Sequence, residues 1–440
     1  MFKTVINAFK IKEIRKKLIY TIIMLIIVRI GCQVPLPGTD ADVVEEVLGG
    51  LTGSGFGFFN AMTGSSFSSM SIFALNITVY ITASIIIQLL TIAFPKLEEM
   101  QKEGEDGRRK LGRITRYVTV GLALIESTAM CIGFGNQGIY GDKSGAIYVW
   151  TIICSILVLT AGAVLVMWMG EQITEHGVGN GISIILLVNM VSTMPADFIS
   201  LYQQFVAGAA NVGMAVLSAV IIIAVVVAVV MFIVYLNGGE RRIPVQYSQK
   251  ITSSGRSYGG RSSHIPLKVN TAGVIPIIFA ASLYQFPVII AGFVNGNQTA
   301  EWTKYFSSGS WFDTTNMLYT LGLIPYLGLI IFFAYFYTQI TFNPAQVSEN
   351  IKKQGGFVPG IRPGKATEDY FAGALKYLIF IGAVGLIIVT LIPMIVSGVF
   401  NASLSFAGTS IIIVVSVVIE TAKQIESMMH VRNYSGFLAK

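Results

Sequence analysis

Residues 212–242 read VGMAVLSAVIIIAVVVAVVMFIVYLNGGERR, and the first part of this stretch settles the class of fold. The run from Val212 to Leu236 contains no charged residue, and it exceeds the roughly 20 apolar residues that cross the hydrocarbon core of a bilayer. Arg241 and Arg242 follow shortly after it. Basic residues just beyond an apolar run are typical of a span that ends at a cytoplasmic surface. The stretch therefore predicts a transmembrane helix followed by a basic loop.

The composition extends this inference to the whole chain. Of its 440 residues, 53% are hydrophobic and only 12% are charged, against about 25% charged in a typical soluble protein. The mean hydropathy is +0.69. A soluble chain of this length would need a charged surface to cover its core, so an assembly of soluble domains is excluded. We predict a polytopic membrane protein.

Ten apolar runs of spanning length follow one another along the sequence. The fifth is the weakest, because it carries Asn189 and is expected to stop near Pro195. The first has the basic flank of a signal peptide but no small-residue cleavage site, so we expect a retained span. The runs lie near residues 18–34, 72–94, 117–135, 148–170, 182–200, 212–236, 272–294, 316–340, 371–396 and 402–420.

The positions of the basic residues agree with ten spans. The net charge is +7, and 27 of the 30 Lys and Arg residues fall on segments that ten spans place on one face together with both termini. The other face holds only Lys143 and Lys304. This asymmetry predicts that both termini are cytoplasmic. Ten spans also divide into two halves of five, 1–205 and 206–440, and the second would run inverted, as in many transport proteins. Spacing alone leaves that repeat open.

Two features inside the apolar part of the chain are unusual. Residues 48–71, LGGLTGSGFGFFNAMTGSSFSSMS, mix Gly and Ser with phenylalanines. They are compatible with an external loop or with a short re-entrant segment, which must be buried in protein or face a water-filled cavity. Glu126 places a carboxyl group within the third run. Such a residue is a functional-site candidate, unless it reaches the membrane interface.

Two long basic loops, 237–271 and 341–370, interrupt the spans of the second half. Each alternates basic side chains with turn residues and contains stretches that could form hairpins. They could be solvated faces that only set the topology. They could also be arms that dock an acidic partner or the phosphates of an RNA.

The residues do not favour an enzyme or a metalloprotein. The glycine that a phosphate-binding loop needs before Gly364-Lys365 is replaced by Pro359, and Ala366 stands where such a loop has Ser or Thr. The three cysteines and three histidines are scattered, which predicts no metal site. A secondary transporter of small solutes remains an alternative, but the spans offer little beyond Arg29 and Glu126 for its binding site. A membrane-embedded enzyme is a weaker alternative.

Seven motifs, in order among the ten runs, resemble the SecY family, the central subunits of the protein-conducting channel of bacterial plasma membranes. They are RIGCQVPLPG (29–38), SIFALNITVYITASIIIQLL (71–90), EGEDGRRK (103–110), MGEQITEHGVGNGISII (169–185), GERRIPVQY (239–247), HIPLKVNTAGVIPIIFA (264–280) and NPAQVSENIKKQGGFVPGIRPG (343–364).

The resemblance implies an all-α membrane protein with ten transmembrane helices in two inverted five-helix halves around a central pore. A short re-entrant plug helix at about 57–70 would close that pore. The implied function is to pass unfolded secretory polypeptides across the membrane and to release their apolar segments sideways into lipid. No cofactor is implied.

The resemblance also assigns roles to individual positions. The apolar ring of the pore would consist of Ile81, Ile85, Leu186, Met190, Ile278 and Ile413. Plug residues would be Phe59, Asn60, Phe67 and Ser68. The runs at 72–94, 117–135, 272–294 and 316–340 would form a lateral gate, with Glu126 and Asn270 as its polar residues. The residues expected to dock a motor or ribosome are Arg241, Arg242, Arg256, Arg362 and Lys365.

The partners implied by the resemblance are of several kinds. They are small membrane subunits like SecE and SecG, the SecA ATPase motor, the ribosome through its rRNA, signal peptides and unfolded secretory chains, and the lipid bilayer. A plasma-membrane location in a bacterium is implied with them.

Overall fold

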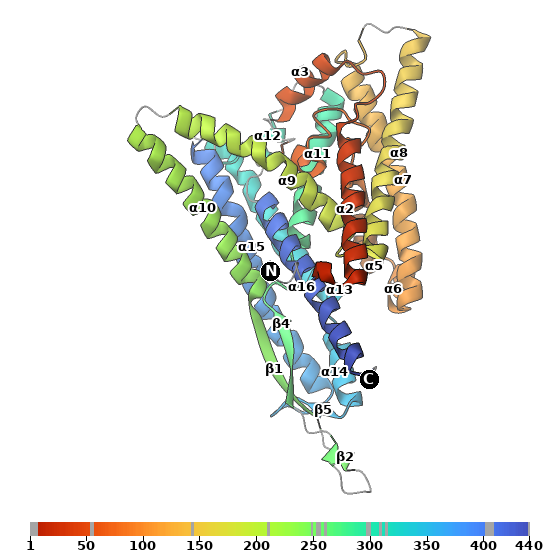
Figure 1. Ribbon diagram of the computed structural model, residues 1–440, viewed down its shortest axis with the longest axis vertical. Coiled ribbons are helices and arrows are strands. Elements are labelled where there is room, and N and C mark those ends of the chain that lie inside the picture. Colours follow the sequence, from red (N-terminus) through yellow and green to blue (C-terminus); the bar gives the residue numbers. More distant parts are fainter. Residues whose placement is uncertain are drawn as a thin grey trace.

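The chain folds into a bundle of helices from which a small sheet protrudes at one end (Figure 1). The computed structural model describes residues 8–52, 57–141, 145–208, 212–247, 250–251, 257–258, 262–295, 301–307, 310–312, 316–400 and 409–438.

The helices of the first half begin with α2. Their bounds are α2 Lys12–Gln33, α3 Ala41–Thr52, α4 Gly57–Thr63, α5 Thr78–Ala93, α6 Pro95–Lys102, α7 Glu105–Gly135, α8 Ala146–His176 and α9 Gly181–Leu201, which continues into the π-helical turn η1 Tyr202–Ala207.

Within the described residues, the strands β1 to β5 all lie in the second half. Its elements are α10 Val212–Gly238, β1 Glu240–Tyr247, β2 Lys250–Ile251, β3 Ser257–Tyr258, β4 Ser262–Lys268, α11 Ile275–Asn295, α12 Thr303–Phe306, the 3-10 helix η3 Met317–Gly322, α13 Leu323–Thr341, α14 Pro344–Lys353, β5 Gly356–Phe357, α15 Lys365–Phe400 and α16 Thr409–Leu438.

Each of the ten apolar runs falls on a helix, although residues 402–408 of the tenth lie outside the described residues. Within the described residues, six helices are long and apolar enough to cross a membrane, or seven if α5 and α6 count as one bent span. The bend between them is 103°. It occurs at Phe94, whose backbone is extended, because the residue before a proline disfavours the helical region and Pro95 starts the next helix.

The expected end of the fifth span near Pro195 is wrong. Helix α9 passes through Pro195 to Leu201 and then widens into η1. Proline is tolerated inside a membrane helix when neighbouring groups and local π adjustments satisfy the freed backbone carbonyls.

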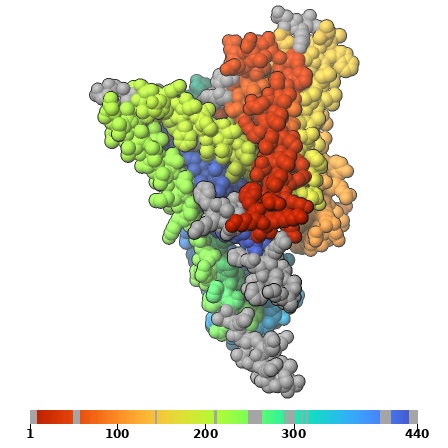
Figure 2. Space-filling model, viewed as in Figure 1, coloured from red at the N-terminus to blue at the C-terminus, as the bar shows by residue number. Residues whose placement is uncertain are grey.

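Apolar side chains also cover the outside of the bundle, as lipid requires. Helix α10 has a mean hydropathy of 3.4 in its most apolar window, yet only 11% of that window is buried. Ile223, on this helix, is 64% exposed. Figure 2 shows α10 and α2 on one open face of the molecule. In water such a face would be costly, whereas lipid tails solvate it.

The two long loops of the second half join in a single sheet of order β4-β1-β5. The antiparallel pairing of β1 with β4 runs from Glu240 opposite Lys268 to Gln246 opposite Ser262, so the predicted hairpin is confirmed for the first loop. Strand β5 of the second loop pairs with the end of β1. Apolar side chains from both loops then share a core with α15, which includes Ile243, Val245, Ile351, Val358 and Phe371.

Candidate functional site

The six residues expected to form the pore ring come together in one buried cluster between the two halves. They project from α5, α9, α11 and α16, which are far apart in the sequence. Their exposed fractions are 5% for Ile81, 3% for Ile85, 1% for Leu186, 0% for Met190, 6% for Ile278 and 0% for Ile413. The cluster is aliphatic at these positions, so it offers dispersion contacts without hydrogen bonds or charges.

Residues 57–70 pack inside the bundle and not outside it. The helix α4 is shorter than the expected 57–70, because it ends at Thr63 and turns follow to Met70. It ends there because Gly64 and Ser65 both have positive φ, of 66° each, which does not continue a right-handed helix. Phe58 and Met62 of α4 belong to the same cluster as the six ring residues.

The other face of this segment packs against the first half. Phe67 contacts Phe59, with ring centroids 5.0 Å apart, and Phe134 of α7, at 6.0 Å. Asn60 and Ser68 are linked, since the Ser68 amide donates to Asn60 Oδ1 at 3.1 Å. All four expected plug residues therefore lie in one folded unit, which we call the α4 segment (57–70).

Three side chains that the sequence analysis did not assign to this site reach the α4 segment. Asn189 Nδ2 donates to the carbonyl oxygen of Met62 at 3.1 Å, and Asn76 Nδ2 to that of Thr63 at 3.3 Å. Arg29 donates through a guanidinium nitrogen to the carbonyl of Gly64 at 3.2 Å. The sequence signal for them was the presence of these polar residues within apolar runs.

Helix α11 packs against α5 and α7 from the first part of the chain and against its neighbour α13. The contact is largely apolar and aromatic: Phe279 meets Phe333 of α13 edge to face, with centroids 5.7 Å apart, and Val288 packs into the cluster of the first half. These four helices are the ones expected to form the lateral gate.

The two expected polar gate residues are not brought together by any hydrogen bond in the described part of the chain. Glu126 is half-buried on α7. Asn270 is 8% exposed, and its Nδ2 donates to Asn237 Oδ1 at 2.8 Å, while Asn237 Nδ2 donates to Ser416 Oγ at 2.8 Å. Asn270 thus ties the start of α11 to α10 and α16.

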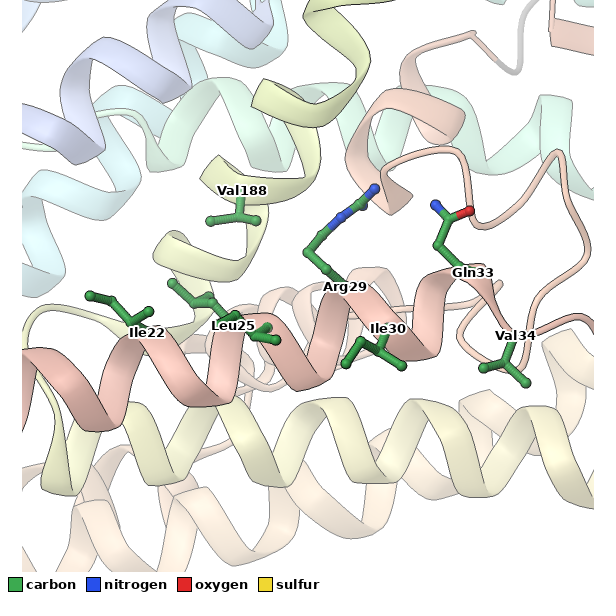
Figure 3. Close-up of a pocket in the computed structure, with 8 residues that line it drawn as sticks. Ile22, Leu25, Arg29, Ile30, Gln33, Val34 and Val188 are labelled. Carbon is green, nitrogen blue, oxygen red and sulfur yellow. The ribbon is translucent and has the colours of Figure 1, made fainter.

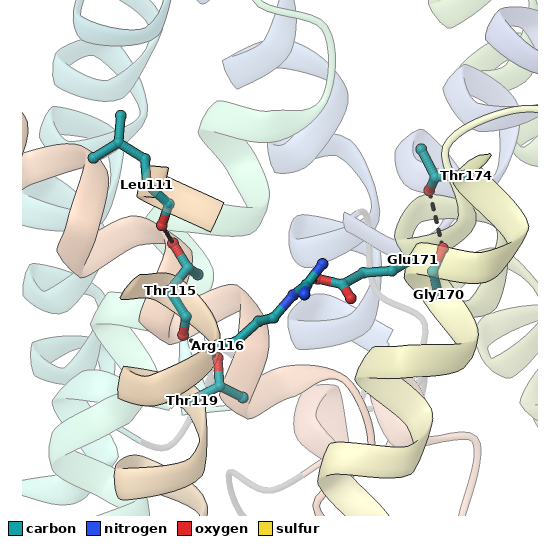
Figure 4. Close-up of polar contacts among 7 residues, drawn as sticks. All are labelled: Leu111, Thr115, Arg116, Thr119, Gly170, Glu171 and Thr174. Carbon is teal, nitrogen blue, oxygen red and sulfur yellow. Dashed lines mark hydrogen bonds and ion pairs between the residues drawn. The ribbon is translucent and has the colours of Figure 1, made fainter. Parts of the chain in front are cut away.

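An ion pair joins α7 to α8 in the first half (Figure 4). Arg116 Nε donates to Glu171 Oε1 at 2.7 Å. One turn beyond Glu171, Thr174 Oγ1 accepts from the Gly181 amide at 2.9 Å and so fixes the turn between α8 and α9. The motif at 169–185 therefore forms the connection between α8 and α9.

The basic residues expected to dock a partner lie on the sheet and on the loop beside it. Arg241 and Arg242 are exposed on β1, and Arg242 pairs with Glu240 at 2.6 Å. Arg362 and Lys365 are exposed where the second loop enters α15, and neither forms an ion pair within the described residues. A bond from Thr367 Oγ1 to the Arg362 carbonyl, at 2.8 Å, holds this turn. Arg256 lies outside the described residues.

In the part of the chain that the structure describes, no group of three or more His, Cys, Asp or Glu side chains could hold a metal ion. The site consists of a buried aliphatic cluster, the short helix α4 packed against it, and the apolar contacts of α11. A basic platform, formed by Arg241, Arg242, Arg362 and Lys365, completes it.

Comparisons with known proteins agree with this arrangement. A family model described as SecY matches residues 71–422. The chain is 41% identical to the protein translocase subunit SecY of Bacillus subtilis, with 100% of both chains covered. It is 39% identical to that of Streptomyces coelicolor, with 98% of each covered.

Solved structures share the fold at lower identity. One described as a protein-conducting channel has a TM-score of 0.67 at 18% identity and covers 96% of each chain. Sec61 from a canine ribosome–channel complex has a TM-score of 0.65 at 17% identity, also with 96% of each chain covered. The match of the family model to most of the sequence, together with relatives of this identity over the full length, shows that the chain belongs to the SecY family.

Proposed function

We propose that this chain is the channel through which unfolded secretory polypeptides cross a bacterial plasma membrane. The observation that carries the proposal is the buried aliphatic cluster, to which both halves of the chain contribute and against which α4 packs. A pore that passes any sequence must not bind one side chain tightly, and aliphatic walls meet that need. A narrow aliphatic constriction also dewets, which opposes ion leakage.

In this proposal the two halves, 1–205 and 206–440, open like a clamshell along α11. The seam of α11 with α5 and α7 contains apolar side chains such as Ile85, Ile278 and Val288, whose separation breaks no hydrogen bond of their own. An apolar segment of the passenger would leave through this seam, because lipid solvates it better than a wet pore does. The α4 segment would be the plug of the resting channel.

The energy for transport would come from a partner at the basic platform. The pairing of the two loops in one sheet supports a docking surface that would include Arg241, Arg242 and Arg362. Its charge suits the phosphates of rRNA or an acidic face of a motor such as SecA. One channel of the same fold was solved in a ribosome complex. We propose the cytoplasm as the side of this platform and of both termini.

The exposed apolar faces of α10 and α2 would receive small membrane subunits like SecE and SecG, with lipid around them. The alternative of a small-solute transporter is weaker, since Arg29, one of its few candidate ligands, donates to a backbone carbonyl of the α4 segment.

The test is crosslinking to a secretory chain stalled midway. Ile85→Cys and Ile278→Cys are each expected to crosslink to the stalled chain, because both belong to the buried cluster. Ile223→Cys, on the exposed face of α10, is the matched control and is expected to react with lipid-phase reagents only. Crosslinks at Ile223 as strong as at Ile85 and Ile278 would contradict the proposal.

A further inference from the structure

We propose that Arg29, Asn76 and Asn189 form a clasp that holds the α4 segment closed and ties it to the first half of the chain. This inference rests on the proposed function, since it assigns a resting state to the plug. It concerns the residues that set the stability of the closed channel.

The end of α4 shows why outside donors are needed. The last carbonyl groups of any helix lack intrahelical partners. Here the Ser65 amide donates to the Asn60 carbonyl at 2.9 Å and the Gly64 amide to that of Ala61 at 3.2 Å. This pair of bonds, with Gly64 at positive φ, is a Schellman motif. These two bonds do not use the carbonyl groups of Met62, Thr63 and Gly64. Within the segment, the Ser66 hydroxyl donates to the Thr63 carbonyl at 2.8 Å.

Each clasp residue donates to one of these three carbonyl groups from outside the α4 segment. Arg29 comes from α2, Asn76 from the turn before α5 and Asn189 from α9. The two asparagines are 1% and 0% exposed, and Asn189 Nδ2 also donates to Asn76 Oδ1 at 3.1 Å. The positive charge of Arg29 lies at the negative end of the α4 dipole, which strengthens its contact.

Arg29 is otherwise hard to explain. It lies on a shallow groove of about 590 Å³ between α2 and α9, whose walls are mainly aliphatic, for example Ile22, Ile26 and Val188 (Figure 3). A charged side chain at this depth is costly unless it has a partner. The Gly64 carbonyl supplies one. Gln33 rises from the same face of α2 in Figure 3 but takes no part in the clasp.

Close approach of the backbones makes the clasp possible. A Cβ atom on Gly64 would lie 2.5 Å from the Arg29 guanidinium and 3.0 Å from Asn189 Cα. All three donors bind main-chain oxygens, so the clasp does not depend on the side chains of the α4 segment.

All three donors belong to residues 1–205. Separation of the halves would therefore uncover the side of α4 that carries Phe58 and Met62 without breaking a clasp bond. Release of the α4 segment becomes a second step, which the clasp controls together with the packing of Phe67 against Phe134. Removing a donor should ease that second step and leave the first unchanged.

The experiment uses the full-length channel, purified with its membrane partners and reconstituted in planar bilayers without any passenger. Arg29→Met and Asn189→Leu are each expected to raise the resting open probability by about tenfold, the effect of one charged or buried hydrogen bond. Arg29→Lys, which keeps the charge and a donor, should restore much of the seal. Gln33→Met is the matched control and should behave as the unaltered chain.

A second background separates a clasp from a general loss of packing. Deleting residues 57–66 removes the three acceptor carbonyls but keeps Phe67 and Met70 in their core. In that background Arg29→Met should add no further conductance. The clasp is refuted if Arg29→Met matches Gln33→Met, or if its effect persists in full after the deletion. Because no passenger is present, these outcomes are independent of the crosslinking test of the channel itself.

Discussion

Ile278 shows what a single residue contributes to the seal. It is 6% exposed and shares the buried cluster with Ile85 and Ile413, which come from distant parts of the chain. Its aliphatic side chain gives the constriction no group that water can bind. In the proposed channel, the function of the position would depend on this lack of polarity as much as on its size.

Replacing Ile278 with Asn is therefore expected to wet the constriction. Ion leakage through the resting channel should rise, and secretory chains with weak signal sequences should be exported more readily. The measurements are bilayer conductance and export of a passenger with a defective signal. Ile278→Val, which loses volume but adds no polar group, is the control. Equal leakage from both variants would show that volume alone matters.

At the scale of elements, the sequence predicted the long helices, but it did not predict how the strands of the two loops pair. The run at 212–236 needs only its own apolarity to be a span, and α10 covers it. The pairing of β5 with β1 joins residues more than a hundred positions apart, so no local pattern could predict it. The end of α4 at Thr63 and its donors Asn76 and Asn189 also depend on tertiary packing, which a sequence pattern does not contain.

Arg362 is an exposed residue of the basic platform. Arg362→Glu should abolish motor-driven export and leave the abundance of the inserted protein unchanged. An exposed charge contributes only about 0–1 kcal/mol to folding, whereas charge reversal in a docking surface repels the partner. Export assays and immunoblots of the membrane fraction measure the two effects. Arg113→Glu reverses an exposed charge on α7 and should be tolerated. A parallel fall in export and abundance for Arg362→Glu would favour a purely topological role.

At the scale of the whole molecule, the proposed balance between closed and open states would depend on the seam where α11 packs against α5 and α7. Glu126 is the one acidic residue in the third apolar run, and it is half-buried on α7. Desolvation of a carboxyl group near the seam would favour whichever state gives it more water.

Glu126→Leu is accordingly expected to shift the equilibrium toward the closed state and to raise the hydrophobicity that a signal sequence needs. A shift of about 1–3 kcal/mol is typical of such coupling. Export of a graded series of signal sequences measures it, with Leu124→Ile, an exposed apolar position on the same helix, as control. Labelling that finds Glu126 in bulk lipid or freely hydrated would contradict a gate role.

The three-stranded sheet has a mechanical consequence. Its strands are continuous with α10 on one side and lead into α11 on the other, and β5 lies between α14 and α15. A protein that grips and turns this sheet applies torque to several helices at once. In the proposed channel, a force applied to the sheet from the aqueous phase would be transmitted to α11 and would rotate that helix. Force and opening would then arrive together, with no chemical signal passing between them.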